Sequence, residues 1–206
     1  MPVTADDVDL SVRLTIEAFG GVADGWDAPA GTLEWTCWET AEHVADDLFF
    51  YATQIGARAL RHAVPFGYGA LREGGPDLTI TARREAGPAG LLQVVEACGA
   101  LLTAVVRTAP PEARAHHVFG DGDAEGFAAM GVAEMLVHAH DIAAGLGVGW
   151  QPPADLCARV LARLFPDVTS TDDPWRTLLW ATGRDDLPDR PRRTEWRWHS
   201  GPIPAA

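Results

Sequence analysis

The sequence predicts an all-α protein, built as a four-helix bundle with a short helical extension at its C-terminal end. Four long segments repeat apolar residues at spacings of three and four, the period of an amphipathic helix. Capping residues, glycines and prolines separate these segments, as they do at helix ends. With 206 residues, 47% of them hydrophobic, the chain can bury one core but is short for two full domains. We expect residues 1–150 to form the bundle and residues 151–206 to pack on it.

The first two helices are predicted from apolar spacing and from one cap. The first is expected over residues 4–22, where apolar residues alternate as in a strand but also fit a helical stripe, and the length of the segment favours a helix. The second begins after Thr36, because Glu39 three residues later completes a capping-box pattern, and its apolar stripe continues to Ala59.

A long loop separates the second helix from the third. Residues 61–90 are rich in glycine, and within them only residues 78–83 have the pattern of a short strand. The third helix is expected over residues 88–108, because Pro88 suits a first helical turn and Pro110–Pro111 stop the helix.

The fourth helix is expected over residues 124–146, and because it is apolar nearly all round it is predicted to be buried. Beyond it, Pro152–Pro153 start a shorter amphipathic helix, and Asp172 with Pro174 marks the start of another. Residues 194–199 alternate in polarity and predict an edge strand or an extended arm.

The charge and the apolar pattern exclude two classes of partner. The formal net charge is −13, and every basic residue except histidine is an arginine. Such a surface repels phosphate backbones, so we expect no nucleic-acid binding. No uncharged apolar stretch reaches about 18 residues, and the N-terminal residues lack the signal-peptide pattern. We therefore expect neither a membrane partner nor secretion.

The cysteines are typical of a cytoplasmic protein. Cys37, Cys98 and Cys157 are odd in number and widely spaced, with no CxxC pair. This disfavours both a disulfide framework and a thiolate zinc site, and predicts a reducing cytoplasm as the compartment.

Three polar residues share one face of the largely apolar fourth helix: Glu134, His138 and Asp141. Glu134 and His138 are four residues apart, so they lie on one face, one turn above each other. A carboxylate and an imidazole that are buried together are costly unless they are paired or bind a metal ion. The pattern leaves both interpretations open: a Glu–His hydrogen bond, or two ligands of a metal site.

A metal site would need a further ligand from another element. His43 on the second helix, four residues before Asp47, is the leading candidate. It lies about 100° from the centre of that helix's apolar stripe, a position that also suits a solvated histidine. His116–His117, in the loop before the fourth helix, can approach the same end of the bundle.

The segment EWTCWETAEHVADDL, residues 34–48, resembles the metal-site entry of the DinB-like superfamily. The branch it is most similar to is the N-terminal domain of mycothiol-dependent maleylpyruvate isomerase. In that pattern a Trp-Thr pair caps the second helix and a metal-binding histidine follows eight residues after the tryptophan. Trp35, Thr36 and His43 have this spacing.

The second motif of that family is a Glu, a His four residues later and an Asp three further on, near the end of the fourth helix. Glu134, His138 and Asp141 match it. The resemblance covers about residues 5–150 and implies a DinB-like four-helix bundle.

By this resemblance, His43, Glu134 and His138 would be the protein ligands of a divalent ion, with Asp141 a supporting group. Zinc is the expected metal, with nickel, iron or manganese as alternatives, and the open positions imply catalysis rather than a structural role. The expected activity is that of a mycothiol-dependent transferase or isomerase. In such a reaction a low-molecular-weight thiol attacks a small electrophile. The chain is expected to be a monomer or a homodimer.

The sequence also departs from the isomerase, whose separate C-terminal domain contributes an arginine to the active site. Here about 56 residues follow Trp150, and their arginines fall in no matching motif. Two other functions therefore stay open. One is a metal-dependent hydrolase with bound water as nucleophile, and the other is a non-catalytic binding or regulatory module.

Overall fold

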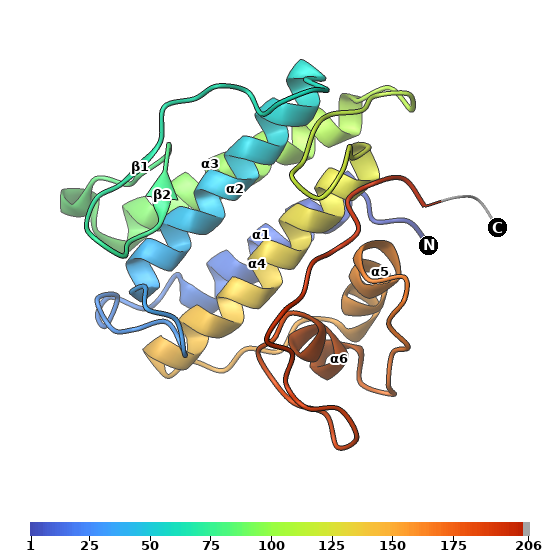
Figure 1. Ribbon diagram of the computed structural model, residues 1–206. Helices are drawn as coiled ribbons and strands as arrows, with labels where there is room; N and C mark the ends of the chain where they lie inside the picture. The colour runs from blue at the N-terminus through green and yellow to red at the C-terminus, as the bar shows by residue number, and fades with distance from the viewer. Residues whose placement is uncertain (204–206) are drawn as a thin grey trace.

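Four long helices form the body of the protein, and two shorter helices follow them (Figure 1). The computed structural model describes residues 1–203. The α-helices are α1 (Ala5–Phe19), α2 (Cys37–Ala57), α3 (Gly87–Thr108), α4 (Ala124–Leu146), α5 (Ala154–Leu164) and α6 (Pro174–Ala181). A two-stranded antiparallel sheet, β1 (Gly69–Ala70) with β2 (Asp77–Leu78), and a 3-10 turn, Arg84–Ala86, lie between α2 and α3. The predicted all-α bundle is confirmed.

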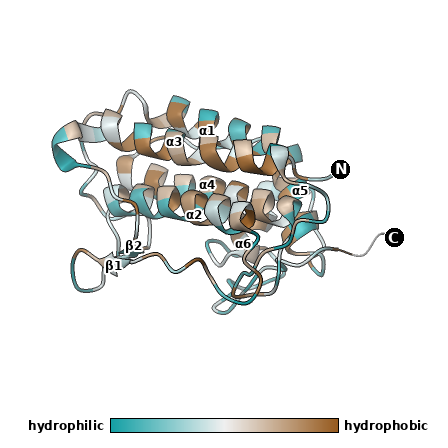
Figure 2. Ribbon diagram, turned by 90° about the horizontal axis from the view of Figure 1, so that it is seen from above, coloured by the Kyte–Doolittle hydropathy of each residue, from teal (hydrophilic) through white to brown (hydrophobic). Residues whose placement is uncertain are grey.

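The four long helices pack in two layers (Figure 2). Helices α1 and α3 pack together in one layer, α2 and α4 in the other, and α2 and α3 share an extensive contact between the layers. Every residue of α4 from 126 to 139 is buried, as its apolar composition predicts. The polar side chains on this helix therefore lie inside the protein.

The capping box at the start of α2 is confirmed. The Thr36 hydroxyl accepts a hydrogen bond from the backbone N–H of Glu39, and the Glu39 carboxylate accepts one from the backbone N–H of Thr36. The helix ends at Ala57, two residues before its predicted end, because Arg58 adopts a left-handed conformation with φ 52°.

The strand predicted over residues 78–83 is wrong apart from its first residue. Backbone N–H groups in this segment pair with carboxylates of α2 instead of with a strand. Thr79 and Ile80 both donate to Asp46, and Ala82 donates to Glu42, which is 2% exposed. These carboxylates accept the hydrogen bonds of the backbone N–H groups, so the segment needs no pairing with a neighbouring strand.

Two further element predictions need correction, and a third is decided between its alternatives. Helix α1 ends at Phe19, where a pair of glycines follows, rather than at residue 22. The cap of α6 is Asp173, whose side chain accepts from the Arg176 N–H, rather than Asp172. For residues 194–199, predicted as an edge strand or an extended arm, the strand alternative is wrong within the described chain, where the segment has neither helix nor strand.

Helix α3 with its preceding turn, residues 84–108, is the one described segment long and apolar enough to cross a membrane by length and composition. This is weak evidence, because core helices of soluble proteins meet the same criterion, and one face of α3 packs inside the bundle.

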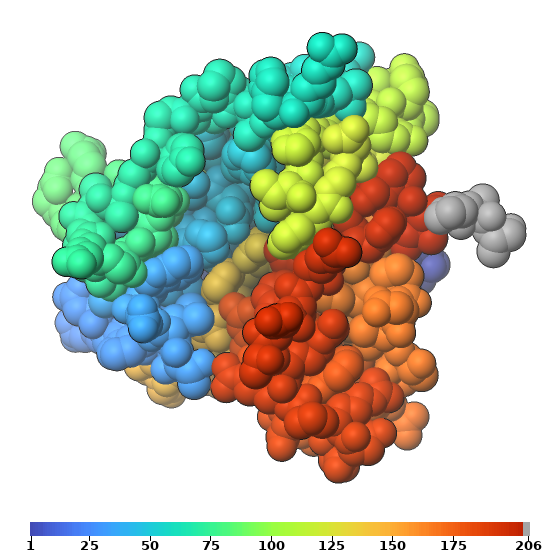
Figure 3. Space-filling model, viewed as in Figure 1, coloured from blue at the N-terminus to red at the C-terminus, as the bar shows by residue number. Residues whose placement is uncertain are grey.

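The C-terminal part of the chain packs against α4. Helix α5 contacts both α4 and α6, and the Trp150 indole N–H donates to the carbonyl of Leu136 on α4. Residues 184–203, here called the C-terminal arm, then pass back along α4 (Figure 1) and cover much of it on that face (Figure 3). That residue 150 divides two units stays a prediction.

Candidate metal centre

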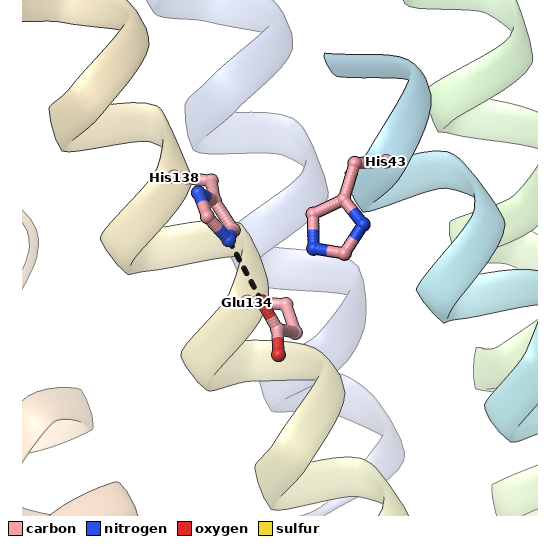
Figure 4. A group of neighbouring side chains, drawn as sticks. All are labelled: His43, Glu134 and His138. Carbon is pink, nitrogen blue, oxygen red and sulfur yellow. Dashed lines mark ion pairs between the residues drawn. The ribbon is translucent and has the colours of Figure 1, made fainter. Parts of the chain in front are cut away.

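Helices α2 and α4 bring three sequence-predicted residues together. His43 comes from α2, and Glu134 and His138 come from successive turns of α4 (Figure 4). The nearest donor atoms of the three side chains lie within 4.8 Å of one another. The His138 Nε2 is 3.1 Å from a Glu134 oxygen, so the Glu–His pair predicted from the spacing is present.

His43 lies at the edge of the buried face of α2, with 22% of its side chain exposed. Its ring packs against Trp35, the residue before the helix cap, at 4.8 Å between ring centroids. It faces the His138 ring at 5.1 Å and 85°. The capping box fixes where α2 begins, and thereby which turn presents His43 to α4.

A chain of buried polar contacts continues behind His138. Its Nδ1 is 3.0 Å from an Asp141 oxygen, and the same oxygen accepts from Arg184 at 3.0 Å. Asp141 is 3% exposed. It therefore contacts the ring nitrogen of His138 that faces away from Glu134, as a supporting group does.

The pair on α4 has shifted pKa values. Burial raises the pKa of Glu134, but the hydrogen bond and charge of His138, with His43 and Arg184, outweigh it, and the net pKa is lowered. Burial lowers the pKa of His138, but its hydrogen bonds to Asp141 and Glu134 outweigh that effect and the net pKa is raised. Both shifts favour the charged forms of the two side chains, as expected for partners that stabilise each other.

Burial also shifts the pKa values of two other groups at the site, His43 and Asp47. Burial, together with the positive charge of His138, lowers the pKa of His43 to about 4. Burial, with the negative charges of Glu134 and Asp46, raises the pKa of Asp47 well above its usual value. Asp47 lies 3.3 Å from His43 Nε2. At neutral pH the His43 imidazole is therefore uncharged, which is the form that binds metals.

The three side chains open into a cavity of about 190 Å³. Its lining residues are His43, Ala133, Glu134, Val137, His138, Thr182, Arg184, Trp196 and Trp198. The last four follow α6 or lie in the C-terminal arm. The sequence analysis did not predict them as site residues, because no spacing rule relates a loop residue to a helix more than forty positions earlier.

The other histidine candidates lie elsewhere. His117 is buried in an aromatic cluster with Tyr51, Phe127 and Trp198. Burial lowers its pKa to about 4, and its Nδ1 accepts from the backbone N–H of Phe119. His116 is half-buried, 3.7 Å from Asp121. Neither belongs to the group of three.

Residues 13–143 match the family described as the mycothiol maleylpyruvate isomerase N-terminal domain. No curated protein and no solved structure gave a significant match. The matched residues include both motifs, from Trp35 through Asp141, and stop before Arg184 and the C-terminal arm. The match spans more than half of the chain and agrees with the resemblance carried by the two motifs. The chain therefore belongs to the family of the mycothiol maleylpyruvate isomerase N-terminal domain.

Proposed function

We propose that this protein is a metal-dependent enzyme that uses a low-molecular-weight thiol, mycothiol or a similar compound, to attack a small electrophile. The reaction is a transfer or an isomerisation. His43, Glu134 and His138 hold one divalent ion, zinc before nickel, iron or manganese. The observation that carries the proposal is the convergence of these three side chains, from two helices, on one cavity.

The donor set fits such an ion. Two imidazole nitrogens and one carboxylate oxygen are ligands that zinc and its neighbours accept, and a set of three leaves positions for a thiol or water. The separations, up to 4.8 Å, are short enough for modest side-chain rotation to bring the donors to one ion. Burying a Glu–His pair beside a neutral histidine also costs desolvation free energy that apolar residues of similar size would not cost, so packing alone does not account for the arrangement.

The surrounding residues prepare the site for thiol chemistry. A divalent ion bound there would supply Lewis acidity, which lowers the pKa of a coordinated thiol toward neutrality. Asp141 accepts the Nδ1 proton of His138 and so leaves Nε2 free to bind, and Arg184 holds Asp141 in place. Trp196 and Trp198 line the cavity, and their large apolar rings would limit the access of water, which strengthens charge interactions inside it.

The thiol must come from solution. Cys37, Cys98 and Cys157 are all buried, and none lines the cavity. A cytoplasmic location follows from the family's link to mycothiol, because a reduced thiol pool is a feature of that compartment.

The first test is metal content, measured by plasma mass spectrometry on untagged protein. We expect about one equivalent of metal in the wild type, as for a single three-residue site, and near none in His138→Ala. His140→Ala is the matched control, because His140 stands on the same helix two residues away and is not among the three. Full metal content in His138→Ala contradicts the assignment.

The second test is thiol dependence. The metal-loaded wild type should gain thermal stability with mycothiol, whereas metal-depleted protein should not, because a ligand stabilises only the state that binds it. Turnover of an electrophile should require the thiol. Turnover without any thiol would instead support the hydrolase, and a metal-free protein that refuses added divalent ions would support the binding module.

A further inference from the structure

A second hollow, of about 200 Å³, lies between α2 and the loop that carries β1 and β2 (Figure 1). Glu39 and Glu42 of α2 line one side of it, and residues between 71 and 84 line the other. It shares no lining residue with the cavity of the metal centre. A ligand in this hollow would therefore occupy a site of its own.

Glu42 contributes a buried carboxylate to this hollow, with 2% of the residue exposed. Its Oε1 accepts a hydrogen bond from the backbone N–H of Ala82 at 2.9 Å, and its Oε2 accepts none within residues 1–203. The side-chain atoms that are fully enclosed without a partner belong to Trp38, Thr103 and Trp198. The Oε2 atom of Glu42 is not one of them, so it keeps access to open space, and the hollow is the space that Glu42 lines.

The two arginines that line the hollow are already engaged. Arg72 donates to both oxygens of Glu39, at 2.6 and 2.8 Å. Arg84 pairs with Asp27 at 2.7 Å. Glu42 is therefore the one acidic or basic residue of the lining that has no ion-pair partner in the described part of the chain.

The rest of the lining is largely apolar and sets the size of a ligand. Pro76, Leu78 and Ala82 are buried, and Leu71 is exposed. An apolar cavity of about 150 Å³ holds a molecule of the size of benzene, whereas drug-sized ligands need about 300 Å³ or more. The hollow therefore suits a small molecule with a short apolar chain and one hydrogen-bond donor.

A positively charged donor fits Glu42 better than a neutral one. Hydrogen bonds between two charged groups are about twice as strong as neutral ones, and the net charge of −13 on the chain attracts cations. A metal ion is disfavoured, because it needs several ligands and one free carboxylate oxygen supplies too few. Among the described residues, the group that could hold a metal ion is the one around His43.

We propose that this hollow binds a small primary amine. The ammonium group donates to Oε2 of Glu42, and the alkyl chain lies against the apolar lining. The proposal goes beyond the thiol-dependent function, because neither the metal ion nor the thiol takes part in it. Each of the two can therefore fail without the other.

The test compares three probes that share one four-carbon chain: n-butylamine, 1-butanol and butyrate. Each is titrated at neutral pH into the full-length, isotope-labelled protein, and NMR follows the backbone N–H of Ala82, which donates to Glu42. The amine should bind about tenfold more tightly than the alcohol, because only the amine makes a charge-assisted hydrogen bond.

Three outcomes would overturn the proposal. Equal binding of the amine and the alcohol would mean that Glu42 does not recognise charge. Tighter binding of butyrate would assign the hollow to its arginines. The absence of a saturable shift with any probe would mean that the hollow is only a gap in the packing.

A pair of variants on α2 locates the effect. Glu42→Gln keeps an acceptor for the Ala82 N–H but removes the charge, and should weaken butylamine binding about tenfold without changing butanol binding. Asp46→Asn is the matched control, because Asp46 also accepts from backbone N–H groups of the 78–83 segment but does not line the hollow. Equal effects of the two variants would contradict the proposal. The comparison of probes in the wild type decides the question even where Glu42→Gln does not fold.

Amines can also bind metal ions, so the titration is repeated with metal-depleted wild type and with His138→Ala. Butylamine affinity should be unchanged in both, because the hollow and the metal centre share no lining residue. Loss of binding in these two samples would place the amine at the metal centre and overturn the proposal. Failure of the protein to take up zinc would overturn the proposed function and leave the amine site standing.

Discussion

In the proposed metal site, Asp141 would act through the ring of His138, which it contacts, rather than through an oxygen of its own. The contact at Nδ1 favours the tautomer whose Nε2 carries the lone pair that can bind a metal ion. Removing such a hydrogen-bond partner from a metal-binding histidine weakens metal binding about 10- to 100-fold. We expect Asp141→Asn to lower zinc affinity by this factor, measured by competition with a chromophoric chelator. Asp185→Asn, which removes an exposed partner of Arg176, is the control. Unchanged affinity in Asp141→Asn would contradict the supporting role.

The three cysteines should be unreactive in the folded protein. Burial raises the pKa of Cys37 and of Cys98 to about 11, and that of Cys157 to about 12. Because a raised pKa keeps a thiol protonated below that pH, little thiolate is present at pH 8. At pH 8, Ellman's reagent should react slowly with the native protein. In guanidinium, where the protein is unfolded, it should react with all three thiols. Reactivity should rise only as the pH approaches 11, and rapid labelling at pH 8 would contradict the prediction.

Single residues differ in how far the sequence could place them. Glu134 and His138 could be paired from spacing alone, since a helix fixes what lies four positions apart. His43 needed the family pattern, because its helical position suited a solvated side chain equally well. The structure resolves the conflict: Trp35 covers one side of the ring, and His138 lies on another.

At the scale of elements, the close approach of α4 to the entry of α2 depends on Gly145. A Cβ at this position would overlap the Cys37 sulfur and the Pro29 carbonyl oxygen. Gly145→Ala should therefore destabilise the protein by about 1–3 kcal/mol, the usual cost of overpacking, measured by urea denaturation. The backbone oxygen of Pro29 cannot move aside as the end of a flexible side chain can.

Gly56→Ala on α2 is the matched control for that substitution. Its Cβ would meet Val105 at 3.5 Å, an ordinary contact. Alanine is favoured over glycine in a helix by up to about 1 kcal/mol, so this variant should be neutral or more stable. A Gly145→Ala protein as stable as Gly56→Ala would show that the α2–α4 approach is not tight.

The helices could be predicted from sequence because their signals are local. The Thr36 capping box and the apolar α4 need only neighbouring residues to be recognised. The segment 78–83 could not be predicted in the same way. Its backbone is satisfied by Asp46 and Glu42 from a helix more than thirty residues away, and an alternating pattern contains no information about such partners.

At the scale of the whole molecule, the candidate site has two parts with different origins. The three candidate ligands lie within the family-matched residues, whereas Arg184, Trp196 and Trp198 come from the C-terminal extension and close the cavity. The first part repeats a pattern visible in the sequence. The second depends on how the arm packs on α4, which is a long-range contact, and so could be found only in the folded structure.

The attachment of the arm gives the last prediction. Arg163 on α5 pairs with Asp123, the cap of α4, at 2.9 Å, and donates to the carbonyls of His199 and Ser200 at 3.1 Å. Removing one partner of a buried pair costs about 3 kcal/mol or more. Arg163→Met should lower the free energy of unfolding by this amount. It should also release the arm, so that trypsin cleaves faster at the arginines of the arm.

Arg159→Met separates release of the arm from loss of stability alone. Arg159 stands one turn earlier on α5 and pairs with Asp7 at 2.6 Å and Asp155 at 2.7 Å, so it ties α5 to α1 without touching the arm. Its loss should also lower the free energy of unfolding but leave cleavage in the arm slow, because proteolysis follows local opening. Equal cleavage of the two variants would mean that the arm is secured elsewhere.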